Sequence, residues 1–334
     1  MARSVDAHIS TPPESRAINP RLSGTARVFG PVPSRRLGRS LGVDLVPAKT
    51  CTYDCIYCES GRTTHLTVER FSPYSVKEIV DEIQQQLGRT SCSPEIITLS
   101  GAGEPTLNAD LGDLINRIKN LTHLPVAVLT NGSLLGLKEV RHDLARADLV
   151  LPSLDAVSVE VFNRINRPHP SLQIGEIISG LLDFRREYPG EIWLEILLVS
   201  GINDLTPEVN ALRKVVERLQ PVRVQLNTVD RPPAAPWARP VSGETLGKLA
   251  CLLGRPAEVI SRSASPASSE PAAEDLAQRI VEMVSRRPCT LQQISNGLGA
   301  EFAQVSELLN SMTQKGQIDC RRHQDNYYYT SRIS

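Results

Sequence analysis

Three cysteines lie close together in the segment 51–58, which has the sequence CTYDCIYC. Three residues separate Cys51 from Cys55, and two residues separate Cys55 from Cys58. This spacing is too tight for a stable disulfide framework, but a short loop with three thiolates can bind one corner of a small inorganic cluster. Three thiolates on a four-iron cluster leave one iron without a protein ligand, and an open iron can bind a substrate or a cofactor.

Two other interpretations of these cysteines are open. A zinc site normally takes a fourth ligand, which His65 or Cys92 could supply. The three thiols could also be unrelated to each other. The cysteines outside the segment are scattered, a pattern typical of a reducing cytoplasm and not of a secreted disulfide scaffold: Cys92, Cys251, Cys289 and Cys320.

The segment resembles the signature of the radical S-adenosylmethionine (radical SAM) superfamily, CxxxCxxC with an aromatic residue, here Tyr57, before the last cysteine. The resemblance implies that Cys51, Cys55 and Cys58 bind one [4Fe–4S] cluster and that its free iron chelates S-adenosylmethionine. One electron would then cleave this cofactor to a 5′-deoxyadenosyl radical, which abstracts hydrogen from a substrate. A reductant such as flavodoxin or ferredoxin would supply the electron.

The composition is that of an ordinary globular chain. Of its 334 residues 40 % are apolar and 22 % charged, which allows one large domain and one small one. Lys plus Arg equals Asp plus Glu, 37 against 37, so bulk charge does not favour a nucleic-acid or membrane-surface protein. No apolar run approaches a membrane span, and segment 1–25 is predicted to be a polar, disordered leader without a signal peptide. We therefore expect a cytoplasmic protein.

Six short apolar segments alternate with helical patterns between residues 26 and 240. The expected strands are 41–46, 95–100, 125–130, 148–153, 192–199 and 222–228. Strands that alternate with helices predict a parallel sheet with right-handed crossovers. Because six units fall short of the eight of a closed barrel, we expect an α/β fold, an open, partial (β/α)6 TIM-like barrel. The resemblance implies the same fold.

Two further parts follow the predicted barrel. Residues 241–273 contain a helix near 244–253, which could close the open side, and a Ser/Ala/Pro-rich linker. Residues 274–334 show three helical patterns and a hairpin, which resemble a winged helix. Its third helix carries Glu301 and Glu307 against Lys315, so it is poorly suited to phosphate contact. We expect a protein-docking or structural role for this region in preference to DNA binding. Arg321, Arg322 and His323 of the hairpin are better suited to DNA contact than the third helix is.

Unusual residues follow several of the predicted strands. Loops after parallel strands share one face, where ligands bind. The resemblance implies that Tyr57 lies near adenine, that the glycine-rich stretch 101–104 approaches the methionine group, and that Ser153 and Asp155 bond the ribose. The full set of expected cofactor contacts is Tyr57, Gly101, Gly103, Glu104, Asn131, Ser153, Asp155, Val199 and Gly201.

Basic side chains are the candidates for substrate contact, because Arg can bind phosphate or carboxylate with two hydrogen bonds. They are Arg35, Arg36, Arg167, His169 and Arg231. The alternative is that these residues form ion pairs that tie loops to the barrel rim. No catalytic side chain is assigned.

Longer motifs, such as 30–38, 103–106, 166–169 and 231–233, resemble the branch that contains wyosine tRNA synthases. This implies an RNA base as substrate, with a protein as second choice. Wyosine enzymes carry a second cysteine cluster upstream, whereas this chain has no cysteine before Cys51. An iron–sulfur sensor that regulates transcription through the winged helix is the alternative to an enzyme.

Overall fold

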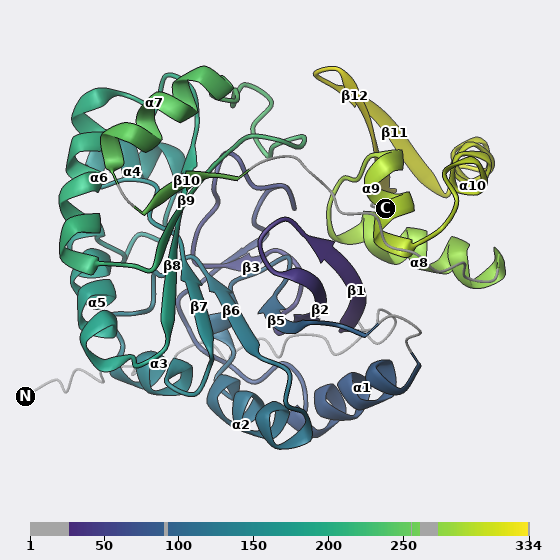
Figure 1. Ribbon diagram of the computed structural model, residues 1–334, viewed down its shortest axis with the longest axis horizontal. Coiled ribbons are helices and arrows are strands. Elements are labelled where there is room, and N and C mark those ends of the chain that lie inside the picture. The colour runs from purple at the N-terminus through teal and green to yellow at the C-terminus, as the bar shows by residue number, and fades with distance from the viewer. Residues whose placement is uncertain (1–26, 90–92, 255, 261–272, 333–334) are drawn as a thin grey trace, which may run out of the picture.

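The computed structural model describes residues 27–89, 93–254, 256–260 and 273–332. The predicted leader, Cys92 and most of the predicted linker lie outside these residues. Eight strands form the main sheet in the order β1-β2-β5-β6-β7-β8-β9-β10, and every neighbouring pair from β2 onward is parallel (Figure 1). The strands are β1 (Val28–Ser34), β2 (Gly38–Asp44), β5 (Ile96–Ser100), β6 (Val126–Thr130), β7 (Leu149–Pro152), β8 (Glu191–Leu198), β9 (Arg223–Thr228) and β10 (Ala257–Val259).

The prediction of a partial parallel barrel is confirmed, and β2 and β5 to β9 are the six predicted strands. The two edge strands were not predicted. Strand β1 pairs antiparallel with β2 and contains Pro31, and proline is tolerated in strands mainly at edges. Strand β10 has only three residues, too few to give a pattern.

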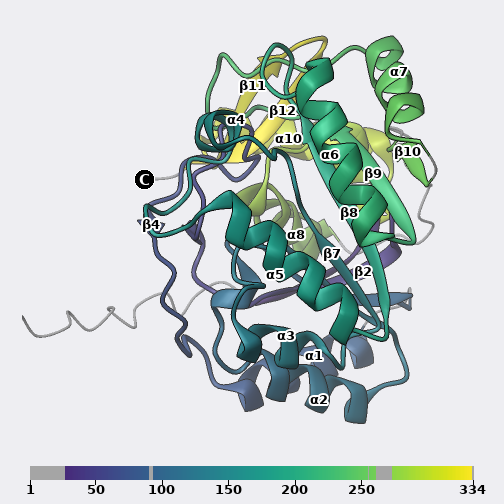
Figure 2. The ribbon, with the colours of Figure 1, turned by 90° about the vertical axis from the view of Figure 1, so that its left-hand side faces the viewer.

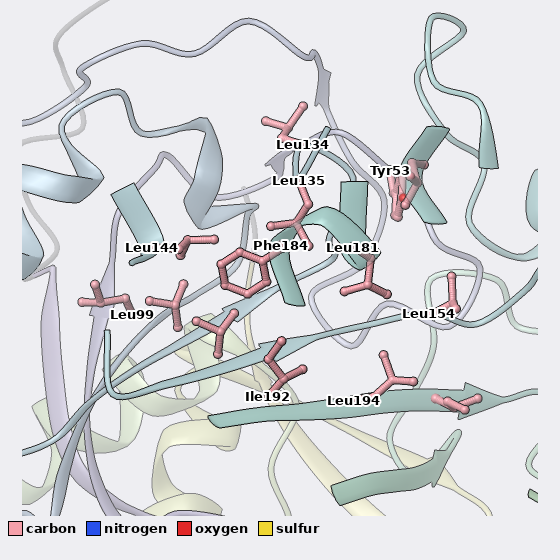
Figure 3. Packing of buried hydrophobic residues seen from close by; sticks show 14 of the residues in the cluster. Tyr53, Leu99, Leu134, Leu135, Leu144, Leu154, Leu181, Phe184, Ile192 and Leu194 are labelled. Carbon is pink, nitrogen blue, oxygen red and sulfur yellow. The ribbon is translucent and has the colours of Figure 1, made fainter. Parts of the chain in front are cut away.

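Helices cover the outer side of the curved sheet (Figures 1 and 2). They are α1 (Val76–Arg89), α2 (Leu111–Leu121), α3 (Lys138–Leu144), α4 (Val159–Ile165), α5 (Ile174–Glu187) and α6 (Thr206–Leu219). The core lies between these helices and the sheet, where Phe184 of α5 packs close to Leu144 of α3 and Ile192 of β8 (Figure 3). All three side chains are fully buried, so truncating Phe184 to Ala should cost about 3–5 kcal/mol.

Helix α7 (Gly243–Leu253) begins at Ser242, whose hydroxyl accepts a hydrogen bond from Thr245 N and so caps the helix. It packs against α6 and β10. It therefore continues the outer layer at the last strand of the sheet.

The C-terminal unit contains α8 (Ala273–Arg286), α9 (Leu291–Leu298), α10 (Phe302–Gln314) and a hairpin of β11 (Ile318–His323) and β12 (Asn326–Ser331). Thr290 and Gln293 form a capping box at the start of α9. Leu276, Ile294 and Leu309 belong to a hydrophobic core separate from that of the barrel. The three helices and the hairpin lie where the sequence predicts them, and their assignment as a winged helix stays a prediction. The unit contacts β1 through α9 (Figure 1).

Within the described ranges, no helix combines enough length with enough apolar character to cross a membrane.

Candidate functional site

The cysteine loop follows β2 and runs through two short strands, β3 (Thr50–Cys51) and β4 (His65–Leu66), which pair in parallel. Two apolar residues between the cysteines anchor it. Ile56 is fully buried, and the ring of Tyr53 packs edge-on against Phe162 of α4 at a centroid distance of 5.5 Å. This packing fixes the backbone while all three cysteines stay partly exposed.

Each cysteine of the loop has a different polar neighbour. Asn131 Nδ2 lies 3.6 Å from Cys51 Sγ, and Asn166 Nδ2 lies 3.5 Å from Cys55 Sγ. The Lys49 ammonium opposes the burial that raises the pKa of Cys58. Donors and positive charge beside sulfur stabilise cysteine-bound clusters, so these surroundings fit three thiolate ligands.

Burial raises the pKa of all three thiols, that of Cys51 to about 12. The thiols therefore need a further source of positive charge to ionise, as a bound iron cluster provides. The described residues hold no group of three or more His, Cys, Asp and Glu side chains placed to bind one metal ion. A [4Fe–4S] cluster takes its thiolates at separate iron corners.

Tyr57 and Asp155 meet at the end of β7. The Tyr57 hydroxyl donates to Asp155 Oδ2 at 2.5 Å, and Asn166 Nδ2 donates to the same oxygen at 2.8 Å. Leu197 N of β8 donates to Asp155 Oδ1 at 2.9 Å. Burial raises the pKa of Asp155 to about 6, although the three hydrogen bonds lower it. The carboxyl group therefore joins the cysteine loop to the ends of β7 and β8.

Glu104 is buried and joins the ends of β5 and β6. Its Oε1 accepts hydrogen bonds from Thr106 N, Thr106 Oγ1 and Thr130 Oγ1, and its Oε2 accepts one from Asn131 N. Burial raises its pKa against the opposing effect of these bonds. Since a carboxylate has about four acceptor positions, only Oε2 keeps capacity for a further donor.

The two glycines of this loop are needed for different reasons. Gly101 has φ +125°, a conformation that side chains disfavour, and its missing Cβ leaves room for the Asp44 carboxylate. A Cβ on Gly103 would come within 2.5 Å of Thr50 O and of the Val46 side chain. The close approach of Gly103 to the backbone before Cys51 therefore places the glycine-rich loop against the cysteine loop.

The remaining expected cofactor residues follow β7 and β8. Ser153 is partly buried, and its backbone forms an isolated parallel β-bridge with Glu195 of β8. Val199 N donates to Asn203 Oδ1 at 2.7 Å, and Gly201 adopts φ +73° in the same turn. The buried amide of Asn203 also donates to the carbonyls of Asp155 and Leu197, so it fixes this turn against β7.

The predicted substrate arginines all form ion pairs. Arg35 pairs with Asp230 at 3.3 Å, Arg36 with Glu195 at 2.8 Å, Arg167 with Asp54 at 3.6 Å and Arg231 with Glu59 at 2.5 Å. The ring nitrogen of His169 lies 2.9 Å from Ser171 Oγ.

Arg35 and Arg36 occupy the turn between β1 and β2, yet their partners belong to β8 or follow β9. The turn therefore reaches across the barrel interior. The predicted alternative, ion pairs that tie loops together, thus describes much of this set.

Several residues of the site were not predicted from the sequence. Asn166 belongs to a motif that resembles the family, but its contacts with Asp155 and Cys55 were not foreseen. Helix α4, which carries it at its C-cap, was not predicted either. Lys49 and Glu59 flank the cysteine segment closely, and charge next to a metal-binding motif is the signal that could have found them.

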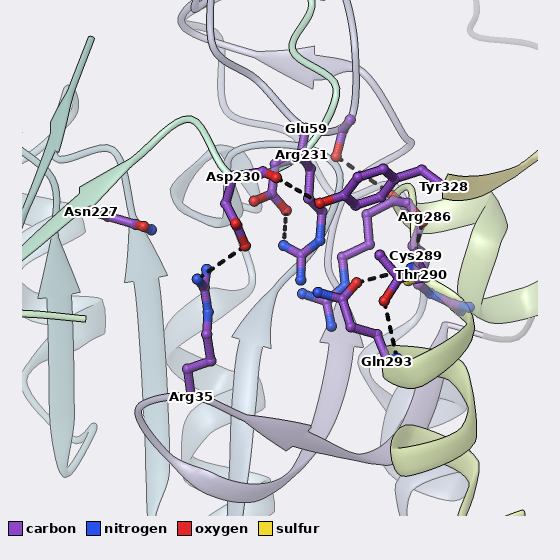
Figure 4. Close-up of polar contacts among 12 residues, drawn as sticks. Arg35, Glu59, Asn227, Asp230, Arg231, Arg286, Cys289, Thr290, Gln293 and Tyr328 are labelled. Carbon is purple, nitrogen blue, oxygen red and sulfur yellow. Dashed lines mark hydrogen bonds and ion pairs between the residues drawn. The ribbon is translucent and has the colours of Figure 1, made fainter. Parts of the chain in front are cut away.

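The C-terminal unit docks beside this site (Figure 4). Arg286 forms an ion pair with Asp44 at 3.0 Å and lies over the Phe29 ring, and Ser60 Oγ donates to its carbonyl at 3.3 Å. The buried Tyr328 hydroxyl of β12 donates to Asp230 O at 2.8 Å. One face of the hairpin is therefore used for docking.

Comparisons with known proteins identify similar chains. The sequence model of the radical SAM superfamily matches residues 45–210. A protein named GTPase Obg from Brachyspira hyodysenteriae is 38 % identical over 300 residues, 88 % of this chain and 43 % of that protein. This chain therefore spans less than half of that relative. A UPF0026 protein from Methanocaldococcus jannaschii is 34 % identical over 236 residues, 70 % of this chain and 72 % of that protein.

Among solved structures, that of TYW1 with a lysine–pyruvate adduct bound is similar in fold. It has a TM-score of 0.50 and 18 % identity, and the match covers 69 % of this chain and 76 % of that chain.

Proposed function

The chain belongs to the radical SAM superfamily, and we propose that Cys51, Cys55 and Cys58 hold the [4Fe–4S] cluster of this radical SAM enzyme. The observation that carries the proposal is the separate polar neighbour of each sulfur: Asn131 at Cys51, Asn166 at Cys55 and Lys49 at Cys58. These neighbours come from different parts of the barrel. A coincidental group of three thiols would not need such support.

When bound, the cluster would supply one electron for reductive cleavage of S-adenosylmethionine, the source of the radical that would abstract hydrogen from the substrate. The chain's own residues orient the two groups. Tyr57 is held by Asp155, so its ring has one fixed position at the edge of the loop. We assign Tyr57 and the 199–201 turn to the adenosine part of the cofactor.

The glycine-rich loop is assigned to the methionine part of the cofactor. The backbone N–H of Asn131 donates a hydrogen bond to Glu104 and so fixes Asn131 in place. The side-chain amide of Asn131 in turn contacts Cys51 and Thr52. The remaining acceptor position of Glu104 Oε2 suits an ammonium group. Asp155 acts mainly through Tyr57 and Asn166, while Ser153 remains assigned to the ribose hydroxyls.

The substrate we propose is an RNA base, with modification of a protein as the second choice. Radical SAM enzymes need an electron donor, and flavodoxin or ferredoxin is the donor proposed here. None of the described cysteines forms a disulfide, which supports a reducing cytoplasm as the place of the reaction. The alternative of an iron–sulfur transcription regulator finds no support in the comparisons.

Anaerobic reconstitution of the full chain with iron and sulfide tests the proposal. About four irons per chain should bind to the wild-type protein, and Cys51→Ala should lose them. Cys251→Ala is the matched control, because this exposed cysteine lies on α7. Dithionite and S-adenosylmethionine should together release methionine and 5′-deoxyadenosine. Full iron binding by Cys51→Ala, or no release of these products by the wild-type protein, would contradict the assignment.

A further inference from the structure

We propose that Arg35, Arg231 and Arg287 bind an oxyanion group of the substrate, a phosphate or a carboxylate, and that the C-terminal unit supplies Arg287 to this site. The inference rests on the proposed function and narrows its substrate to molecules that carry such a group.

The first argument is the position of Arg231, which is 5 % exposed. Its Nη1 pairs with Glu59 at 2.5 Å, but its buried Nε has no hydrogen-bond partner. An unpaired N–H of a buried guanidinium is costly, because the group has lost water without gaining an acceptor. A ligand oxygen at this place would restore that bond.

The second argument is the balance of charge. Among the described residues, four arginines gather here, Arg35, Arg36, Arg231 and Arg287, and three carboxylates pair with or lie close to them, Glu59, Asp230 and Glu195. Four positive and three negative charges leave one positive charge. Clusters that only tie loops together need no such excess, whereas an anion-binding site does.

The third argument is Arg287 itself, which directly follows α8 and is partly buried. No described carboxylate forms an ion pair with it. Burial and the neighbouring charge of Arg231 lower its pKa, and the same two causes lower the pKa of Arg35. Both guanidiniums would therefore gain stability from a bound negative charge.

The site adjoins the cysteine loop. Glu59, the partner of Arg231, follows Cys58 directly, and Ala234 N donates to Cys58 O at 3.1 Å. Arg35, Asp230 and Arg231 of the barrel lie next to Tyr328 and Arg286 of the C-terminal unit (Figure 4). A substrate bound through its anionic group would thus be enclosed between the two parts beside the proposed cluster.

The experiment measures binding of inorganic phosphate, and separately of malonate, to the reconstituted full chain by calorimetry at constant ionic strength. Wild-type protein should bind at least one probe, and Arg287→Gln should weaken that binding about tenfold or more. Arg287→Lys, which keeps the charge, should recover most of the loss. Arg321→Gln is the matched control, because this exposed arginine lies on β11 and should leave binding unchanged. The probe that binds more tightly indicates whether the substrate carries a phosphate or a carboxylate group.

Three outcomes would overturn the inference: neither probe binds to wild-type protein, Arg287→Gln binds as well as wild type, or Arg321→Gln weakens binding equally. Cleavage of S-adenosylmethionine without substrate is measured on the same samples. If wild-type protein cleaves S-adenosylmethionine but binds neither anion, this inference alone is refuted. If wild-type protein neither binds iron nor cleaves S-adenosylmethionine, the proposed function is refuted.

Discussion

The hydroxyl of Tyr57 lies 2.5 Å from Asp155 Oδ2, although 98 residues separate them in the chain. The aromatic residue of the cysteine loop is thereby attached to the end of β7. Asn166 binds the same carboxylate oxygen and reaches Cys55. One buried carboxyl group thus links the loop that would hold the cluster with the strands that would hold the cofactor.

Replacing Asp155 by Asn should weaken cofactor binding and spare the iron. The amide nitrogen of Asn would face a donor, either Tyr57 and Asn166 or Leu197 N, so one of these contacts is lost. A loss of about 1–3 kcal/mol corresponds to roughly tenfold to hundredfold weaker S-adenosylmethionine binding. Equilibrium dialysis measures the affinity, and the visible spectrum reports the cluster. Asp183→Asn, on the exposed side of α5, is the control. Unchanged affinity would mean that the adenosine pocket lies elsewhere.

Glu104→Gln should chiefly lower the stability of the fold. Its carboxylate accepts four hydrogen bonds from Thr106, Thr130 and Asn131, and an amide can accept on one oxygen only. The unfolding free energy should fall by about 1–3 kcal/mol, as seen in denaturant titration. Glu217→Gln, exposed on α6, should change it by less than about 0.5 kcal/mol. Equal stabilities for the two variants would show that the Glu104 network is unimportant for folding.

The stability of the cluster-free protein should depend on pH through Asp155. Its pKa rises from 3.8 to about 6 on folding, mainly because it is buried. The folded chain then binds more protons than the unfolded chain between these values, so its unfolding free energy falls as pH increases from about 4 to about 6.

The Asp155 contribution over this window is on the order of 1–3 kcal/mol. Urea titrations across the window should show the fall in wild-type protein, and the curve of Asp155→Asn should be flatter. Parallel curves for the two proteins would assign the titration to another group.

Lys49→Met should make the reduction potential of the cluster more negative. The Lys49 ammonium is buried without a hydrogen-bond partner, and its charge acts on Cys58. Removing a positive charge near the cluster disfavours the added electron by on the order of 50 mV. Electron paramagnetic resonance during a redox titration measures the potential. Lys77→Met, exposed on α1, should leave it unchanged. A potential that moves equally in both variants would rule out a local effect of Lys49.

The sequence alone determined the cysteine loop and the six core strands. Both are local patterns: the thiol spacing lies within eight residues, and each strand is a short apolar segment between helical patterns. Such patterns predict the fold class because burial of apolar faces leaves few ways to arrange alternating strands and helices. The shared face of the loops after the strands then follows from the parallel sheet.

Only the tertiary structure decided which charges meet. The partners Glu59 and Arg231 are 172 residues apart, and Asp44 and Arg286 are 242 apart, so no local pattern could pair them. The same holds for Arg35 and Arg36, which reach across the barrel from the β1–β2 turn. The docking of the C-terminal unit beside the cysteine loop depends on these distant contacts. Ion pairing depends on distance in space, which the chain sets only after its core has packed.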